Sequence, residues 1–133
     1  MSIYFHTLNV LVVDDDENQR TFMRVYLMKL GVKNFVFAED GEEALKALHG
    51  ELFHVVLTDN EMPIMNGPNL VTNIRADKIL CHLKVAMISG NIGVEGDGAL
   101  VKFLKEHGVL PVPKSGFTGD VLREVLITLT KEP

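Results

Sequence analysis

Apolar residues along this chain fall into short continuous runs that alternate with longer segments of helical periodicity. Residues 10–13 form an apolar run that is rich in valine and too short for a helix, which predicts a buried strand. From Asp16 onward the apolar residues recur every three or four positions, and Gly31 ends this pattern, as glycine commonly ends helices. The first 31 residues therefore predict a strand that is followed directly by a helix.

The same alternation of strand and helix repeats along the rest of the chain. We expect strands at residues 10–13, 34–38, 54–59, 84–90 and 109–114, and helices at residues 16–30, 39–50, 67–76, 99–107 and 120–130. Five such units favour one parallel sheet with helices on both faces, because crossovers between parallel strands are right-handed. The sequence thus predicts an α/β domain at residues 8–131, a doubly wound five-stranded parallel sheet, after a short N-terminal extension at residues 1–7.

Composition and charge narrow the classes of function. The 13 basic and 18 acidic residues give a net charge of −5, which argues against binding to nucleic acid. Cys81 is the only cysteine of the sequence, so a disulfide framework or a thiolate metal site within the chain is excluded. The first residues lack a signal-peptide pattern, and no segment has the roughly 20 apolar residues that span a bilayer. We therefore expect a cytoplasmic protein that does not associate with membranes.

Polar residues whose side chains could bind a ligand or take part in a reaction lie at or just after the ends of four of the five predicted strands. Asp14 and Asp15 follow the first strand, Asp59 ends the third, Ser89 lies at the end of the fourth and Lys114 at the end of the fifth. Taken singly, each of these is readily explained as a loop acid or a solvated side chain. Because ligands of doubly wound folds bind beyond the carboxyl ends of the strands, the five together indicate a functional site.

The run of four acids from Asp14 to Glu17 divides into two parts. Asp16 and Gln19 match a capping box, and Glu17 suits the first turn of a helix. Asp14 and Asp15 are left, and carboxylates held close to one another at a strand end need a cation to stay ionised. Oxygen ligands without histidine or cysteine favour Mg²⁺.

The candidate metal site, Lys114, Ser89 and Asp59 together indicate phosphoryl transfer. A metal, a lysine, a hydroxyl and a carboxylate nucleophile recur in that chemistry. The sequence has no Walker-type glycine loop, so we do not expect a bound nucleotide.

Four segments carry a resemblance to a known family. In order and spacing, "VLVVDDDENQR", "VVLTDNEMPIMNG", "VAMISGN" and "PVPK" resemble the receiver domain of two-component response regulators, from about Leu8 to Thr130. The resemblance implies the flavodoxin-like receiver fold and a phosphoprotein of signal transduction. It implies that Asp59 takes a phosphoryl group from a histidine kinase or a histidine phosphotransfer protein and that phosphorylation switches binding to a downstream protein target. It implies no enzyme activity beyond self-phosphorylation from small donors and autodephosphorylation.

The resemblance also implies a Mg²⁺ site. Asp15 and Asp59 would bind the ion through their carboxylates, Glu61 through its backbone carbonyl, and Asp14 mainly through water.

Lys114 and Ser89 have roles by the same resemblance, and the sequence departs from the family beside Lys114. Lys114 would pair with the phosphoryl oxygens, and Ser89 would swing to hydrogen-bond one of them. The family usually follows this lysine with proline, often through a cis bond, whereas Ser115 and Gly116 stand here. Pro111 replaces the aromatic switch residue, so coupling between Ser89 and an aromatic side chain cannot operate in its usual form.

Two other functions remain open at this point. One is a pseudo-receiver, an interaction module that phosphorylation does not control because the Lys114 loop is altered. The other is a Mg²⁺-dependent phosphatase with an aspartate nucleophile, for which Glu61 stands at the offset of the usual second acid. No segment is long enough for the cap that such phosphatases place over the substrate.

Three apolar residues are candidates for partner binding. Phe22 and Val25 lie beside the core-facing stripe of the first helix, close to Asp15, and predict a docking patch for the helical phosphodonor. Phe22 could instead tuck into the edge of the core. On the last helix, Ile127 projects almost opposite Leu122, as a second candidate patch for output.

Overall fold

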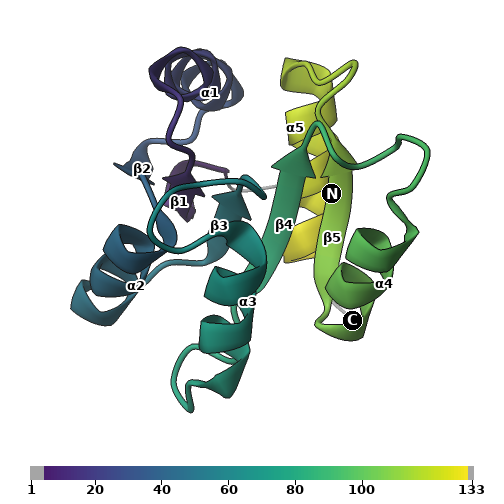
Figure 1. Ribbon diagram of the computed structural model, residues 1–133. Coiled ribbons are helices and arrows are strands. Elements are labelled where there is room, and N and C mark those ends of the chain that lie inside the picture. Colours follow the sequence, from purple (N-terminus) through teal and green to yellow (C-terminus); the bar gives the residue numbers. More distant parts are fainter. Residues whose placement is uncertain (1–4, 132–133) are drawn as a thin grey trace.

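Within residues 5–131, which the computed structural model describes, five parallel strands alternate with five α-helices (Figure 1). The strands are β1 (Asn9–Val13), β2 (Asn34–Ala38), β3 (Val55–Thr58), β4 (Lys84–Ser89) and β5 (Val109–Pro113). The helices are α1 (Glu17–Leu30), α2 (Gly41–Gly50), α3 (Gly67–Ala76), α4 (Gly98–Glu106) and α5 (Gly119–Thr130). Every predicted element is present, and the predicted fold is confirmed.

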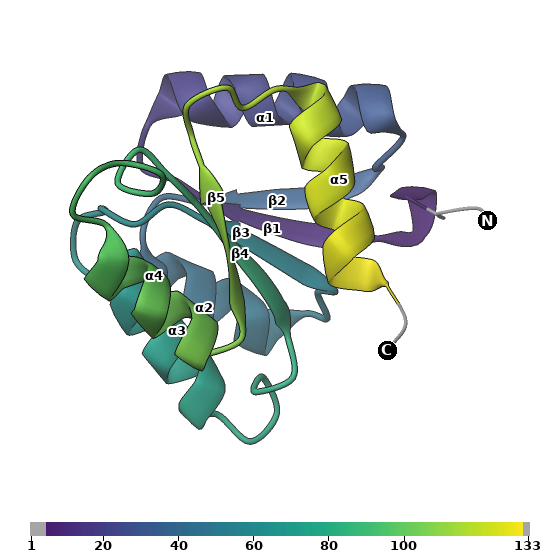
Figure 2. The ribbon, with the colours of Figure 1, turned by 90° about the vertical axis from the view of Figure 1, so that its right-hand side faces the viewer.

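The sheet has the strand order β2-β1-β3-β4-β5, so the direction of winding reverses between β1 and β3. Helices α1 and α5 cover one face of the sheet, and α2, α3 and α4 cover the other (Figure 2). In doubly wound folds the point of reversal is where ligands bind, beyond the carboxyl ends of the strands.

Two apolar clusters fill the space between the sheet and its helix layers. Val10 and Val12 belong to the cluster beneath α1 and α5, whereas Leu11 and Val13 belong to the cluster beneath α2, α3 and α4. Successive residues of a strand point to opposite faces, so burial on both faces requires an unbroken apolar run. This is why the strands read as continuous runs in the sequence.

Helix α1 begins immediately after the acidic run. The Asp16 side chain accepts hydrogen bonds from the N–H groups of Asn18 and Gln19, which confirms Asp16 as the N-cap. The N–H of Asp16 donates to Oδ1 of Asp14 at 3.0 Å, so Asp14 takes the place that the predicted capping box gives to the Gln19 side chain. Gly31 ends α1 in a left-handed conformation with φ of 89°.

The residues before β1 also pack on the domain. Phe5–Thr7 form a short 3₁₀-helix, and Phe5 is buried in the cluster beneath α1 and α5. Residues 1–4 of the expected N-terminal extension lie outside the described residues, and the domain start at residue 8 stays a prediction. Within residues 5–131, no helix combines the length and the apolar character needed to cross a membrane.

Candidate functional site

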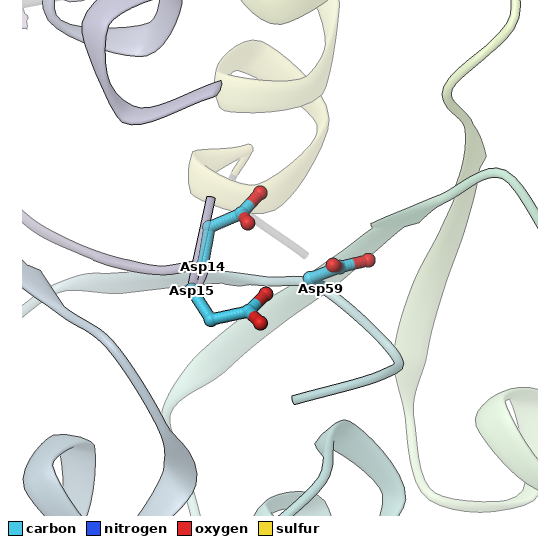
Figure 3. A group of neighbouring side chains, drawn as sticks. All are labelled: Asp14, Asp15 and Asp59. Carbon is cyan, nitrogen blue, oxygen red and sulfur yellow. The ribbon is translucent and has the colours of Figure 1, made fainter. Parts of the chain in front are cut away.

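Three carboxylates meet at the carboxyl edge of the sheet. Asp14 and Asp15 directly follow β1, and Asp59 directly follows β3, whose Thr58 is paired with Val13 of β1. The ligand oxygens of the three aspartates lie within 4.8 Å of one another, as Figure 3 shows for their side chains. The sequence-based expectation that these acids come together is confirmed.

Lys114 and Ser89 complete the same edge. The Nζ atom of Lys114 lies 3.8 Å from Oδ1 of Asp59. The backbone N–H of Lys114 donates to the carbonyl oxygen of Ser89 at 3.0 Å, which ties the end of β5 to the end of β4. The Ser89 side chain is almost fully buried and donates a hydrogen bond to Oδ1 of Asn91 at 3.1 Å. Glu61 lies two residues after Asp59, and its side chain is exposed.

Burial makes two of these acids costly to ionise. Burial raises the pKa of the Asp59 carboxyl, and this rise is opposed by the hydrogen bond from the Asn60 N–H and by the Lys114 ammonium. Burial likewise raises the pKa of Asp14, whose carboxylate accepts the Asp16 N–H. Partly desolvated, mutually repelling carboxylates of this kind bind a hard cation favourably, and their all-oxygen chemistry fits Mg²⁺. Asp14, Asp15 and Asp59 are the side chains that could hold it.

The segment after Lys114 forms a tight turn. The N–H of Phe117 donates to the carbonyl oxygen of Lys114 at 3.0 Å, and Gly116 has φ of 75° at the third position of the turn. The ring of Phe117 packs against that of Tyr26 on α1, with centroids 6.0 Å apart. No peptide bond in residues 5–131 is cis, so the Lys114–Ser115 bond is trans. The Lys114 side chain lies beside Asp59 with this bond in the trans form.

The loop from Asp59 to α3 approaches the site closely at Gly67. The N–H of Gly67 donates to the carbonyl oxygen of Asn60 at 2.8 Å. A Cβ atom at Gly67 would overlap with the carbonyl oxygen of Asp59 and would lie 2.6 Å from Cε of Met87. In the same loop Ile64 has φ of 68°, a left-handed conformation that is rare for a β-branched residue.

The acid cluster opens into a cavity of about 250 Å³ between α1 and the turn after Lys114. Asp14, Asp59 and Lys114 line its polar end, and Phe22, Met23 and Phe117 are among the apolar residues that line the rest. The carboxylates are therefore accessible to a group that enters from outside.

The three aspartates at this edge lie within the part of the chain that one family model matches. The model for the response regulator receiver domain matches residues 10–109. The chain belongs to this family. Receiver domains of this kind are signalling modules of two-component systems rather than enzymes.

Individual relatives support the assignment of this receiver domain. It is 30% identical over 125 residues to the chemotaxis protein CheY of Pseudomonas aeruginosa, covering 94% of this chain and 91% of that protein. It is 32% identical over 125 residues to CheY-3 of Vibrio cholerae, covering 94% and 87% of the two chains. A chain of the CheX–CheY–BeF₃–Mg²⁺ complex from Borrelia burgdorferi superposes with a TM-score of 0.80 at 26% identity, covering 94% of this chain and 90% of that one.

The three predicted partner-binding residues differ in exposure. Phe22 and Val25 are exposed on α1, with Phe22 54% accessible, so Phe22 is not tucked into the core. Ile127 does not project from α5 as we expected, because it is half-buried and packs against the cluster beneath α1 and α5. A helical wheel places Ile127 relative to Leu122 on its own helix but does not show how far neighbouring elements reach around that helix.

Two asparagines beside the site of this receiver domain were not predicted from the sequence. The side chain of Asn60 donates to Oδ1 of Asn91 at 3.1 Å, and Asn91 also bonds to Ser89. The only signal in the sequence is that Asn60 adjoins Asp59 and that Asn91 lies two residues after Ser89.

Proposed function

We propose that Asp59 of this receiver domain accepts a phosphoryl group from a phosphohistidine on a histidine kinase or a histidine phosphotransfer protein, in the presence of Mg²⁺. Phosphorylation would then change the affinity of the domain for a downstream protein target. The observation that carries this proposal is the meeting of Asp14, Asp15 and Asp59 within 4.8 Å, with the Lys114 ammonium 3.8 Å from Asp59.

The metal in this proposal is held by the acid cluster. Asp15 and Asp59 would supply carboxylate oxygens, Asp14 would act mainly through water, and Glu61 would supply its backbone carbonyl. A bound Mg²⁺ offsets the negative charge of the phosphoryl oxygens and orients them. The solved complex of CheX and CheY from Borrelia burgdorferi, which contains Mg²⁺ together with BeF₃, supports this choice of ion.

Asp59 is the nucleophile of the transfer. The Asn60 N–H and the Lys114 ammonium both approach Oδ1 of Asp59, so we assign the attack to Oδ2. A bond from this oxygen to phosphorus forms while the phosphorus–nitrogen bond of the phosphohistidine breaks, and the released imidazole takes a proton from solvent. Lys114 then pairs with the phosphoryl oxygens, and the Ser89 hydroxyl turns to donate to one of them.

The altered loop does not remove Lys114 from the site. The turn closed by Phe117 and the bond from the Lys114 N–H to Ser89 keep the lysine beside Asp59 without a cis proline. This geometry favours a phosphorylated receiver over a pseudo-receiver. In the same loop, Ser115→Pro tests whether the native turn limits the lifetime of the phosphoryl group, and we expect little change because Lys114 is already well placed.

The test is Mg²⁺-dependent labelling with radioactive acetyl phosphate, comparing the wild type with Asp59→Asn. We expect the wild type to be labelled and Asp59→Asn to lose labelling, since an amide is neither a nucleophile nor an anionic ligand. Asp120→Asn, an exposed aspartate in the first turn of α5, is the matched control and should be labelled like the wild type.

Each outcome of this test has a clear meaning. Labelling that survives in Asp59→Asn would show that the acceptor is a different residue. A wild type that is never labelled would identify a pseudo-receiver, and rapid turnover of the donor into free phosphate would indicate the phosphatase.

For the phosphodonor we propose a docking surface on α1 that includes Phe22 and Val25. Both side chains are exposed on the helix that begins beside the acid cluster, and Phe22 also lines the cavity at the site. Phe22→Ala should slow transfer from a protein phosphodonor and leave labelling by acetyl phosphate unchanged. Equal slowing with both donors would mean that Phe22 supports the site itself instead of the interface.

A further inference from the structure

Two loops at the rim of the site are joined through asparagine side chains. Oδ1 of Asn91 accepts a hydrogen bond from Oγ of Ser89 at 3.1 Å and another from Nδ2 of Asn60 at 3.1 Å. The backbone N–H of Asn91 donates to Oγ of Ser89 at 3.0 Å. We call this set of contacts between Asn60, Asn91 and Ser89 the asparagine bridge.

The asparagine bridge occupies the only hydroxyl proton of Ser89. A serine hydroxyl has one O–H to donate, and here it is directed at Asn91. The Ser89 side chain is 1% exposed, so water cannot readily replace this partner. Donation from Ser89 to an oxygen of a phosphorylated Asp59 therefore requires that the bond to Asn91 be broken first.

The main chain of Ser89 is fixed while its side chain can turn. The carbonyl oxygen of Ser89 accepts hydrogen bonds from the N–H groups of Ile92, at 3.2 Å, and Lys114, at 3.0 Å. A change in the partner of Ser89 is thus a rotation of the side chain combined with release of Asn91, which is exposed and has room to move.

We propose that Asn91 is a positioning residue that holds Ser89 in its unphosphorylated orientation, so that a phosphoryl group on Asp59 competes with Asn91 for the Ser89 hydroxyl. This role rests on the phosphorylation of Asp59 proposed above. Asn60 extends the effect to the acceptor itself, because its N–H donates to Oδ1 of Asp59 at 2.8 Å while its side chain holds Asn91.

An ordinary serine turn accounts for only part of the asparagine bridge. In such turns the serine oxygen accepts from the N–H two residues later, as Oγ of Ser89 does from Asn91. That bond uses the backbone of Asn91 and survives in Asn91→Ala. The hydrogen bond from the Ser89 hydroxyl to the Asn91 side chain is additional. Asn91→Ala removes this bond and the bond between Asn91 and Asn60, and it leaves the backbone bond in place.

The test is isothermal titration with beryllofluoride, an analogue of the phosphoryl group, at saturating Mg²⁺. Loss of one competing hydrogen bond should make Asn91→Ala bind beryllofluoride about two- to tenfold more tightly than the wild type. Asn69→Ala, an exposed asparagine of α3, is the matched control and should bind like the wild type. Urea denaturation of each variant checks that the fold is intact.

The deciding measurement is a double-mutant cycle with Ser89→Ala. Without the hydroxyl there is nothing for Asn91 to hold, so Asn91→Ala should change the affinity of Ser89→Ala by less than about twofold. The same tightening in both backgrounds would overturn the proposal and assign Asn91 a general effect on the loop. Binding by Asn91→Ala that equals or is weaker than that of the wild type would also overturn it.

Failure of this inference is distinguishable from failure of the proposed function. A wild type that binds beryllofluoride, paired with an unresponsive Asn91→Ala, rejects the role of Asn91 and leaves phosphorylation of Asp59 in place. A wild type that neither binds beryllofluoride nor is labelled by acetyl phosphate rejects both.

Discussion

Gly67 is the position at which a single methyl group should disturb the site most directly. It is the first residue of α3, and no side chain fits there because a Cβ atom would overlap with the carbonyl oxygen of Asp59. The same Cβ atom would lie 2.6 Å from Cε of Met87 and 3.0 Å from Cα of Asn60. Gly67 does not have a positive φ, so space alone excludes alanine.

The size of the effect follows from these distances. Non-bonded carbon atoms sit about 3.5–4.0 Å apart, so in Gly67→Ala the α3 backbone and the end of β3 must separate by about 1 Å. Overpacking of this kind destabilises folded proteins by about 1–3 kcal/mol. A displacement of about 1 Å at Asp59 should also lower the rate of labelling by acetyl phosphate by up to about 100-fold.

Gly98→Ala is the matched control, since Gly98 is the first residue of α4 and a Cβ atom there meets nothing within 4 Å. Alanine at Gly98 should be neutral or stabilise the protein by up to about 1 kcal/mol. Urea denaturation and labelling by acetyl phosphate, measured for both variants, check the comparison. Equal denaturation midpoints and equal labelling rates for Gly67→Ala and Gly98→Ala would refute the steric reasoning.

Three further predictions concern charge, strain and backbone support. Burial raises the pKa of Asp14 and Asp59 above the values of the unfolded chain. In the absence of divalent ions, the free energy of unfolding should therefore rise as the pH falls from 7 toward these raised pKa values. Urea denaturation midpoints in the presence of a chelator measure this change. A midpoint that only falls over this range would contradict the assignment. Ile64→Asn should stabilise the protein by about 1 kcal/mol in the same assay, because asparagine tolerates the φ of 68°. Arg75 donates hydrogen bonds to four backbone carbonyls in the segments before β4 and β5. Arg75→Met should therefore destabilise the protein by about 2–4 kcal/mol. A urea midpoint that hardly changes would show that Arg75 does not support these segments.

The fold could be predicted from the sequence because each signal is local and the signals agree. Gly31 ends α1 and Gly67 begins α3 as expected, and no predicted boundary differs from the observed one by more than about two residues. Asp14, Asp15 and Asp59 could be brought together in advance, because the carboxyl ends of adjacent parallel strands share one edge of the sheet.

The contacts that could not be predicted depend on where two separate loops or layers lie in space. Asn60 and Asn91 lie in different loops and meet only because β3 and β4 are neighbours, so no periodicity marks them. Asp14 takes the Asp16 N–H in place of Gln19, since a buried carboxylate two residues away is nearer than a side chain one helical turn on. Ile127 likewise packs against an apolar cluster that several elements build, which a pattern within one helix does not reveal.

The position of β5 at one edge of the sheet has a consequence for self-association. The N–H of Lys114 points to β4, and because neighbouring residues of a strand alternate, Pro111 and Pro113 occupy the outward positions. Proline has no N–H, so at these two positions the free edge of β5 lacks the donors that another strand would need in order to extend the sheet. Pro111, which stands where the resemblance implies an aromatic switch residue, thus also disfavours edge-to-edge aggregation of the domain.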